Sequence, residues 1–290
     1  MEVFAVPDAV KQHPKMCAGD ITFVSYRETG SLLKNMVVFN QYAISFVLNG
    51  QKEIYRSTEN TVIKAGQAML IPEGNSIIAE HSPNRNQYHS LVIFFPGHLA
   101  ANLLDRHHIA LDKALPPHNG DSFIHFSSTG YLNEYLRGIQ ALIATGHQLS
   151  YPIALHKLEE LLLVIYELFP TQLVNLFSRN RDSDKLSLKS LVEKNLFSKL
   201  TLDELAFLAN RSLSSFKRDF EKTYGIAPQK YIRDRKLEVA SAELISGKQA
   251  TEIFDAYGYE NLSNFNTAFK KKFGVTPASY KNTATLNVLQ

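Results

Sequence analysis

The chain has 290 residues, 44% of them hydrophobic and 20% charged, so it is a globular protein long enough for about two domains. Its one cysteine, Cys17, excludes an internal disulfide and a cysteine zinc cluster, and it fits a reducing compartment. The N-terminus has no basic segment followed by an apolar one, and the most apolar stretch, 158–169, is too short and too acidic to span a bilayer; we therefore expect a cytoplasmic protein with no membrane partner.

The net charge of +3 is unevenly distributed along the chain. Residues 181–290 hold 18 Lys and Arg against 13 Asp and Glu, whereas residues 1–180 hold 13 against 15. All ten histidines lie at or before His156. A small positive balance is often only a solvated surface, but its position favours an anionic partner for the C-terminal part.

The first part of the chain has the pattern of short β-strands. YAISFVL and QKEIYRS, within residues 42–57, flank Asn49-Gly50, and they predict a β-hairpin because this dipeptide tolerates the positive φ of a two-residue turn. Further strands are predicted, with Gly and Pro between them, at 61–65, 68–72, 76–80 and 89–95. Closely spaced short strands predict a small barrel or sandwich over about residues 17–100.

From about Thr129 the apolar residues recur at helical spacing. GYLNEYLRGIQALIATG and PIALHKLEELLLVIYELF predict two helices within about 129–170, and Pro152 and Pro170 bracket the second. The apolar positions of this second helix nearly encircle it, which indicates burial on more than one side. We expect these helices to cover the barrel and to mediate a homodimer.

Polar residues 178–185 mark a linker, after which every predicted element is helical. The first is an amphipathic helix at 186–197. Thr201 and Glu204 then stand in capping-box relation at the start of another helix. A turn and the helix LSSFKRDFEKTYG follow, so residues of about 201–224 predict a helix-turn-helix.

The helix-turn-helix pattern recurs later in the chain. LSSFKRDFEKTYGIAPQKY and LSNFNTAFKKKFGVTPASY align without a gap at an offset of 49 residues. A second helix-turn-helix is therefore predicted over about 250–273, with one extra residue beside Gly258, which can adopt the left-handed conformation of a wider corner. Residues 228–246 predict a continuous helix about 28 Å long between the copies, which can hold two recognition helices roughly one DNA turn, ~34 Å, apart.

Residues of about 186–282 resemble the DNA-binding domain of the AraC family of bacterial transcription regulators. The resemblance rests on the tandem units, on A-P-x-x-Y-I-x-x-x-K-L after the first, and on F-K-K-K-F-G-V-T-P-x-x-Y after the second. It implies an α+β protein: an N-terminal cupin-like β-barrel with dimerisation helices, and a C-terminal all-α domain of two helix-turn-helix units joined by a long helix. Residues 1–180 would be the regulatory and dimerisation domain, and 181–290 the DNA-binding domain.

The family implies a sequence-specific regulator of double-stranded DNA that inserts its two recognition helices into successive major grooves. Most members are activators, which implies RNA polymerase as a partner. The N-terminal domain would be controlled by a small molecule or by a protein. Helices such as KLEELLLVIYELFP resemble the subset that includes type III secretion activators, whose regulators are often proteins.

On the first recognition helix Phe216 and Phe220 fall on one face and predict its core side. The outward residues are Ser214, Ser215, Lys217 and Arg218, and the resemblance places base contacts on Ser214, Lys217 and Arg218. Arginine is the best bidentate partner of guanine, and lysine reaches guanine or phosphate. The alternative for both cations is a solvated helix face, and for Arg218 also an ion pair with Asp219 or Glu221 on the protein surface.

On the second recognition helix Phe265 and Phe269 predict the core side. The matching outward residues are Ser263, Asn264, Asn266 and Thr267, with Lys270 and Lys271 near the helix end as candidate phosphate contacts. Asparagine can pair with adenine and threonine can touch a thymine methyl, which favours A·T-rich DNA. The sequence departs from the family at Leu262, at Thr267, where arginine is common, and at Phe254, where alanine is favoured.

Enzyme chemistry has little support in the N-terminal part. Cupin enzymes hold a metal with His-x-His and a Glu, but His81 and His89 are spaced differently and His107 adjoins His108. We expect no metal, cofactor or catalytic residue. Two alternatives are a cupin-type enzyme with a DNA-binding appendage and a DNA-repair methyltransferase, which would need a cysteine nucleophile besides a cysteine zinc site.

Small-molecule binding inside the barrel is left open by the sequence. Ile44, Phe46, Ile54 and Tyr55 would line or fill the interior whether or not a ligand binds there. The identity of any effector therefore stays open, as do the target genes.

Overall fold

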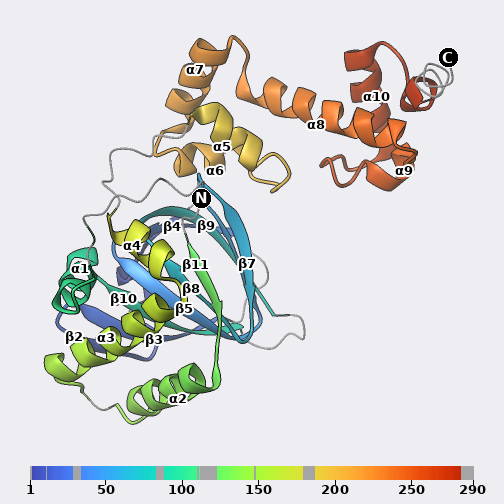
Figure 1. Ribbon diagram of the computed structural model, residues 1–290. Helices are drawn as coiled ribbons and strands as arrows, with labels where there is room; N and C mark the ends of the chain where they lie inside the picture. The colour runs from blue at the N-terminus through green and yellow to red at the C-terminus, as the bar shows by residue number, and fades with distance from the viewer. Residues whose placement is uncertain are drawn as a thin grey trace. The chain divides into compact units, whose positions relative to one another are not determined.

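The computed structural model divides into two compact units, residues 1–186 and residues 187–290 (Figure 1). The first is a β-sheet unit with helices, and in its described residues, 187–281, the second contains helices and no strand, so the predicted α+β class is confirmed. The structure describes residues 2–10, 12–28, 34–82, 88–109, 111, 123–146, 148–178 and 187–281.

The N-terminal unit contains two sheets. The six-stranded sheet has the order β11 (Ile124–Ser127), β8 (Gln67–Ile71), β5 (Tyr42–Asn49), β10 (Tyr88–Phe95), β3 (Ile21–Glu28) and β2 (Lys15–Ala18). The five-stranded sheet has the order β1 (Val3–Val6), β4 (Lys34–Phe39), β9 (Gly74–His81), β6 (Gln51–Tyr55) and β7 (Asn60–Lys64). The strands predicted between residues 61 and 95 are confirmed as β7 to β10.

The predicted β-hairpin at residues 42–57 is wrong, although both of its strands exist. β5 pairs with β8 and β10, whereas β6 pairs with β7 and β9 in the other sheet. Asn49-Gly50 is therefore the corner at which the chain changes sheets. Gly50 has φ of 86°, and a Cβ there would lie 2.3 Å from the carbonyl oxygen of His81, so only glycine fits this corner.

The six-stranded sheet is buried on both faces. One face packs against the five-stranded sheet, and the other packs against the helices α1 (Gly97–Arg106), α2 (Gly130–Ala144), α3 (Tyr151–Leu168) and α4 (Pro170–Ser178). Ile44 and Phe46 lie in the helix-facing cluster, whereas Ile54 lies between the sheets. The expectation that Ile44 and Phe46 line the interior is therefore wrong, because the alternation of β5 turns Ser45 inward instead.

The two predicted helices of this part are confirmed as α2 and α3. Pro152 lies in the first turn of α3, where its missing N–H costs nothing, and Pro170 begins α4. Among the described residues no single helix is long and apolar enough to cross a membrane; α3 and α4 meet that test only together, with a bend of 119° between them.

The C-terminal unit consists of α5 (Leu188–Lys194), α6 (Leu202–Leu208), α7 (Leu213–Tyr224), α8 (Pro228–Ile245), α9 (Ala250–Ile253) and α10 (Leu262–Phe273). The predicted capping box is confirmed: the Thr201 amide donates to Glu204 Oε2 at 2.6 Å, and the Glu204 amide donates to Thr201 Oγ1 at 3.2 Å. Gly258 has φ of 83°, as its place in the second corner predicts. α7 and α10 pack near opposite ends of α8 (Figure 1).

Candidate nucleic-acid interface

The inner face of α7 is fixed by aromatic packing. Phe216 and Phe220 are fully buried, as predicted, and the Phe220 ring lies 4.8 Å from that of Tyr224 and 5.5 Å from that of Tyr231. At the N-terminus of the helix, the Ser212 hydroxyl accepts a hydrogen bond from the Ser215 amide at 3.2 Å. The rotation of α7 about its axis is set by these contacts, and with it the set of residues that face outward.

The outward residues of α7 are polar and accessible. Ser214, Lys217 and Arg218 are exposed, and Ser215 is half-buried. The hydroxyls of Ser214 and Ser215 lie 3.1 and 3.0 Å from the Ser212 Oγ, so the three serines form a group of hydroxyls around the start of the helix. Lys217 and Arg218 extend beyond this group, and 73% of the Arg218 side chain is exposed.

Arg218 shares a carboxylate with a second arginine. Its Nε lies 3.3 Å from Asp219 Oδ1, while Arg211 Nη1 contacts the other oxygen of the same side chain. An exposed ion pair contributes only about 0–1 kcal/mol, so this contact orients Arg218 without holding it back from another acceptor. The pairing of Arg211 with Asp219 could not be predicted, since nothing in the spacing of residues 211 and 219 indicates it.

The inner face of α10 repeats that of α7. Phe265 and Phe269 are fully buried, and the Phe269 ring lies 4.5 Å from Phe273 and 5.4 Å from Tyr280. Asn261 caps the helix, because its Oδ1 accepts from the Asn264 amide at 2.9 Å. The predicted core pair is therefore confirmed in both copies.

The outward face of α10 is neutral over its first turns. Ser263, Asn264 and Thr267 are exposed, and Asn266 is half-buried. The Thr267 hydroxyl donates to the Ser263 carbonyl at 2.9 Å, inside its own helix. Its donor is thus engaged locally, so it offers a partner its methyl group and the acceptor lone pairs of its hydroxyl oxygen.

The three lysines at the end of α10 have different environments. Lys270 and Lys271 are exposed. Lys272 is only 17% exposed, and its Nζ lies 2.8 Å from Glu238 Oε1 on α8. Two of the three ammonium groups therefore face solvent, and the third fastens α10 to α8.

A chain of polar contacts continues from Glu238 along α8. Arg235 contacts Glu238 through Nη1 and lies 3.0 Å from Glu193 of α5 through Nε, and the Tyr231 hydroxyl donates to the same Glu193 oxygen. Hydrogen bonds from Lys272 and Arg235 hold the pKa of Glu238 below its usual value. Burial acts to raise the pKa of Glu193, but the hydrogen bonds from Tyr231 and Arg235 outweigh it and lower that pKa. These contacts link α5, α8 and α10.

The second helix-turn-helix accommodates Phe254, which stands where the family favours alanine. Phe254 is half-buried against the cluster around Phe265 and Phe269. The regular helix before it, α9, is only four residues long, whereas α6 has seven. The bulk of Phe254 therefore coincides with a shorter first helix and a wider corner, and the packing beneath α10 is retained.

The histidines considered for metal binding are engaged separately. His81 Nε2 lies 3.2 Å from Glu53, and His89 Nε2 lies 3.0 Å from the Ser25 hydroxyl. Within the described ranges, no three His, Cys, Asp or Glu side chains converge as ligands of one metal ion.

Two family models match the chain. A model described as the ExsA N-terminal regulatory domain matches residues 42–176, and a model described as a helix-turn-helix domain, of the AraC type, matches residues 205–283. Together they define a DNA-binding transcription regulator with an N-terminal regulatory domain. The chain belongs to the AraC family of transcription regulators. No curated protein matches the chain.

Several solved structures are similar at low TM-scores. ToxT from Vibrio cholerae is 12% identical, with 92% of this chain and 98% of that chain covered and a TM-score of 0.35. The C-terminal domain of the response regulator yesN from Fusobacterium nucleatum is 28% identical, with 32% and 93% covered and a TM-score of 0.31. An AraC-type transcriptional regulator from Chromobacterium violaceum is 26% identical, with 33% and 88% covered and a TM-score of 0.32. These likenesses are too distant to assign a ligand or a target.

Proposed function

We propose that residues 181–290 bind double-stranded DNA sequence-specifically, with α7 and α10 in successive major grooves, and that the chain activates transcription. The observation that carries this proposal is the geometry of α8. α8 packs against both α7 and α10. Its 18 residues span about 27 Å, which is comparable with the ~34 Å of one DNA turn. The chain acts by binding and carries out no catalysis of its own.

The outward residues of the two helices have different roles in this proposal. Lys217 and Arg218, with Ser214 and Ser215, contact base edges or phosphates from α7. Ser263, Asn264, Asn266 and Thr267 contact the second groove through neutral groups. Lys270 and Lys271 contact phosphates, which add affinity without sequence information.

The N-terminal part, residues 1–180, is the regulatory and dimerisation domain in this proposal. It controls the DNA-binding part in response to a small molecule or a protein, and the active regulator recruits RNA polymerase in the cytoplasm of a bacterium. The match of residues 42–176 to a regulatory-domain model supports this division of roles.

A homodimer formed through α2 and α3 is part of the proposal. Both helices leave large apolar side chains exposed after covering the sheet: Tyr131, Tyr151, Ile153 and Leu168 are each 42–55% exposed. Sedimentation should detect a dimer that Ile153→Asp weakens, whereas Lys64→Gln, on the exposed side of β7 in the five-stranded sheet, should leave it unchanged. A strict monomer at high concentration, with and without DNA, would overturn this part.

The test of DNA binding is selection of DNA from a random pool by the full-length protein. We expect enrichment of a site with two short boxes about one helical turn, ~34 Å, apart. The double variant Lys217→Ala, Arg218→Ala should not enrich such a two-box site. Arg137→Ala, which removes an exposed charge from α2, is the matched control and should select the wild-type site. Enrichment of no sequence by a folded wild-type protein would contradict the proposal.

A further inference from the structure

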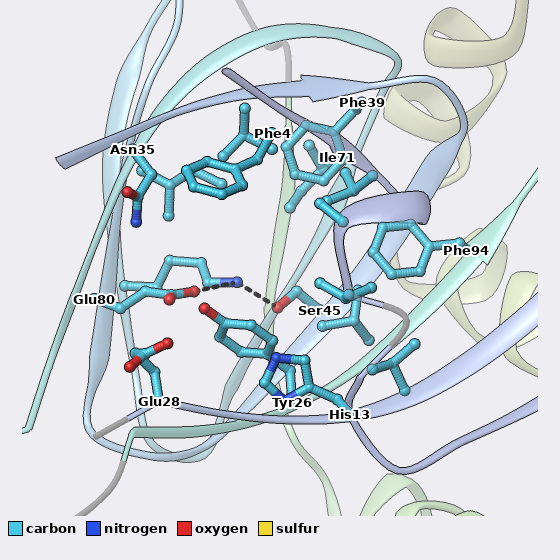
Figure 2. Close-up of a pocket in the computed structure, with 18 of the residues that line it drawn as sticks. Phe4, His13, Tyr26, Glu28, Asn35, Phe39, Ser45, Ile71, Glu80 and Phe94 are labelled. Atoms are coloured by element: carbon cyan, nitrogen blue, oxygen red, sulfur yellow. Dashed lines mark hydrogen bonds and ion pairs between the residues drawn. The ribbon is translucent and has the colours of Figure 1, made fainter. Parts of the chain in front are cut away.

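A cavity of about 300 Å³ lies inside the N-terminal unit, between its two sheets (Figure 2). The N-terminal segment covers part of the cavity. Its wall is lined by Phe4 and Val6 of β1 and by Ala9 and Val10 of the short helix η1 (Asp8–Val10). At ~30 Å³ for each water in the liquid, this volume equals about ten water molecules, or one small organic molecule.

The two ends of the cavity differ in chemistry. Figure 2 shows Phe4, Phe39, Ile71 and Phe94 gathered at one end, an apolar wall of aromatic and aliphatic side chains. The other end is polar, and Figure 2 shows His13, Tyr26, Glu28, Ser45 and Glu80 there. Lys52 belongs to the same end, because it contacts Glu80 and Ser45. Such an arrangement fits an amphipathic ligand with an apolar body and one polar head.

The polar end is organised around a buried ion pair. Lys52 Nζ lies 3.1 Å from Glu80 Oε1 and 3.4 Å from the Ser45 hydroxyl, and the two charged side chains are only 6% and 9% exposed. The Tyr26 hydroxyl also donates to Glu80, and burial raises the pKa of Tyr26 so that it stays a donor. Lys52 is therefore already neutralised, and an anionic ligand would have to compete with Glu80 for it.

The charge balance of the lining favours a cation. Among the described lining residues, the acidic side chains are Glu80, which holds Lys52, and the exposed Glu28, and the one ammonium group is that of Lys52. Burial lowers the pKa of His13, so its imidazole adds no positive charge at neutral pH. A carboxylate has about four lone-pair sites, so Glu80 can accept a further hydrogen bond while it holds Lys52 and Tyr26.

We propose that this cavity binds a small organic amine, with its apolar body against Phe4, Phe39 and Phe94 and its ammonium head at Glu80, on the side of Glu28. The amine is the effector of the regulatory domain, so this inference rests on the proposed function and specifies the ligand class. An apolar carboxylate, which would fit the same volume, is disfavoured by the two acidic side chains.

The experiment is calorimetric titration of the full-length protein with three probes that share one body: phenethylamine, phenylethanol and phenylacetate. We expect phenethylamine to bind at least about tenfold more tightly than phenylacetate, with the alcohol between them. Ala9→Trp should abolish binding of all three, because it fills the cavity from its half-buried wall. Glu134→Gln, the same change on the exposed surface of α2, should alter nothing.

Glu80→Gln should reverse the preference toward phenylacetate, because Lys52 then lacks its partner carboxylate. If circular dichroism shows that this variant is unfolded, the double variant Lys52→Met, Glu80→Gln replaces it and should lose the preference for the amine. The proposal is overturned if phenylacetate binds most tightly to the wild type, if no probe binds at millimolar concentration, or if Ala9→Trp leaves affinity unchanged.

DNA binding measured on the same preparations separates this inference from the proposed function. Protein that binds its DNA site and no probe contradicts only the amine site. Protein that binds the amine and no DNA contradicts only the proposed function.

Discussion

The two helix-turn-helix units of this chain have the same interior and different exteriors. Each recognition helix buries a Phe pair, Phe216 with Phe220 and Phe265 with Phe269, and each begins at a side-chain cap and ends at a left-handed glycine. The exposed faces differ: α7 presents Lys217 and Arg218 where α10 presents Asn266 and Thr267. The residues that determine the fold and those that would contact DNA are therefore separable within one unit.

The corners of the two units show how the same turn is reached by different residues. Asn210 has φ of 54° in the first corner, and Gly258 has φ of 83° in the second. Asparagine tolerates this region better than most residues with a Cβ, and glycine enters it freely. The additional residue of the second unit is thus absorbed where the chain already turns left-handed.

The largest effect should come from removing the shared interior. Phe220→Ala and Phe269→Ala should each destabilise their own unit by about 3–5 kcal/mol, because each leaves a cavity among buried rings. Hydrogen exchange on the full-length protein should show faster exchange in α6 and α7 for the first variant, and in α9 and α10 for the second. Ile245→Ala is the control, since that side chain is 47% exposed. Unequal losses in the two units would show that the interiors are not equivalent.

The next effect tests the exterior of α7. Arg218→Ala should weaken binding to the selected site about tenfold or more and relax the preference at one guanine, since a bidentate contact supplies ~1–3 kcal/mol of discrimination. Titration against the site and against versions with that base pair replaced measures both quantities. If Arg218 stays on Asp219 in the complex, the variant will bind like the wild type and the assignment fails.

A smaller effect concerns the contacts that tie the two units to α8. In the folded protein the pKa values of Glu193 and Glu238 lie below the ordinary value of a glutamate. Their contribution to the free energy of unfolding is therefore present above the unfolded pKa, ~4.3, and is lost as the pH falls through the folded pKa values. Amide protection in α8 and α10 should therefore decline as the solution is acidified below that value. Glu238→Gln should make this decline shallower. If protection falls with pH in the variant as it does in the wild type, Glu238 has no such role in tying α10 to α8.

Lys271 and Lys272 form a matched pair for phosphate contacts. Lys271→Ala should weaken binding to all sequences alike and reduce the slope of log affinity against log salt by about one. Lys272→Ala should leave the slope almost unchanged, because its ammonium group is engaged with Glu238. Equal slopes for the two variants would contradict the different environments of these side chains.

The smallest effect is expected at the exterior of α10. Thr267→Ala should change affinity by less than about twofold, within the ±0.5 kcal/mol of an ordinary surface substitution. The proton of its hydroxyl is already donated to the Ser263 carbonyl, so the substitution removes no free donor from the interface. Binding titrations beside Arg218→Ala measure the contrast, and a comparable loss for both variants would show that the two exteriors contribute alike.

Local features of the fold could be predicted from the sequence because they depend on neighbouring residues. The capping box of Thr201 and Glu204, the left-handed Gly258 and the two Phe pairs are all set within a few residues. Strand pairing was not predictable in this way: Asn49-Gly50 suits a tight hairpin, and the same dipeptide also suits the corner between two sheets. Nor could the interior face of β5 be chosen, since its sheet is buried on both sides.

The candidate DNA interface was predictable to the same extent. Helical spacing identifies the outward residues of α7 and α10, and the structure places most of them on exposed faces. The partners of Arg211 and Lys272 could not be predicted, because Asp219 lies across a turn and Glu238 lies on another helix.

The difference between α7 and α10 is tested most directly by a scan of the selected DNA site, one base pair at a time, with the full-length wild-type protein. We expect uneven sensitivity: large losses at guanine-containing positions in the half-site under α7, and shallow losses in the half-site under α10. Arg218→Ala should flatten the first half only. Equal sensitivity in both halves, or binding that is indifferent to sequence, would contradict the central claim that one repeated fold carries two different DNA contacts.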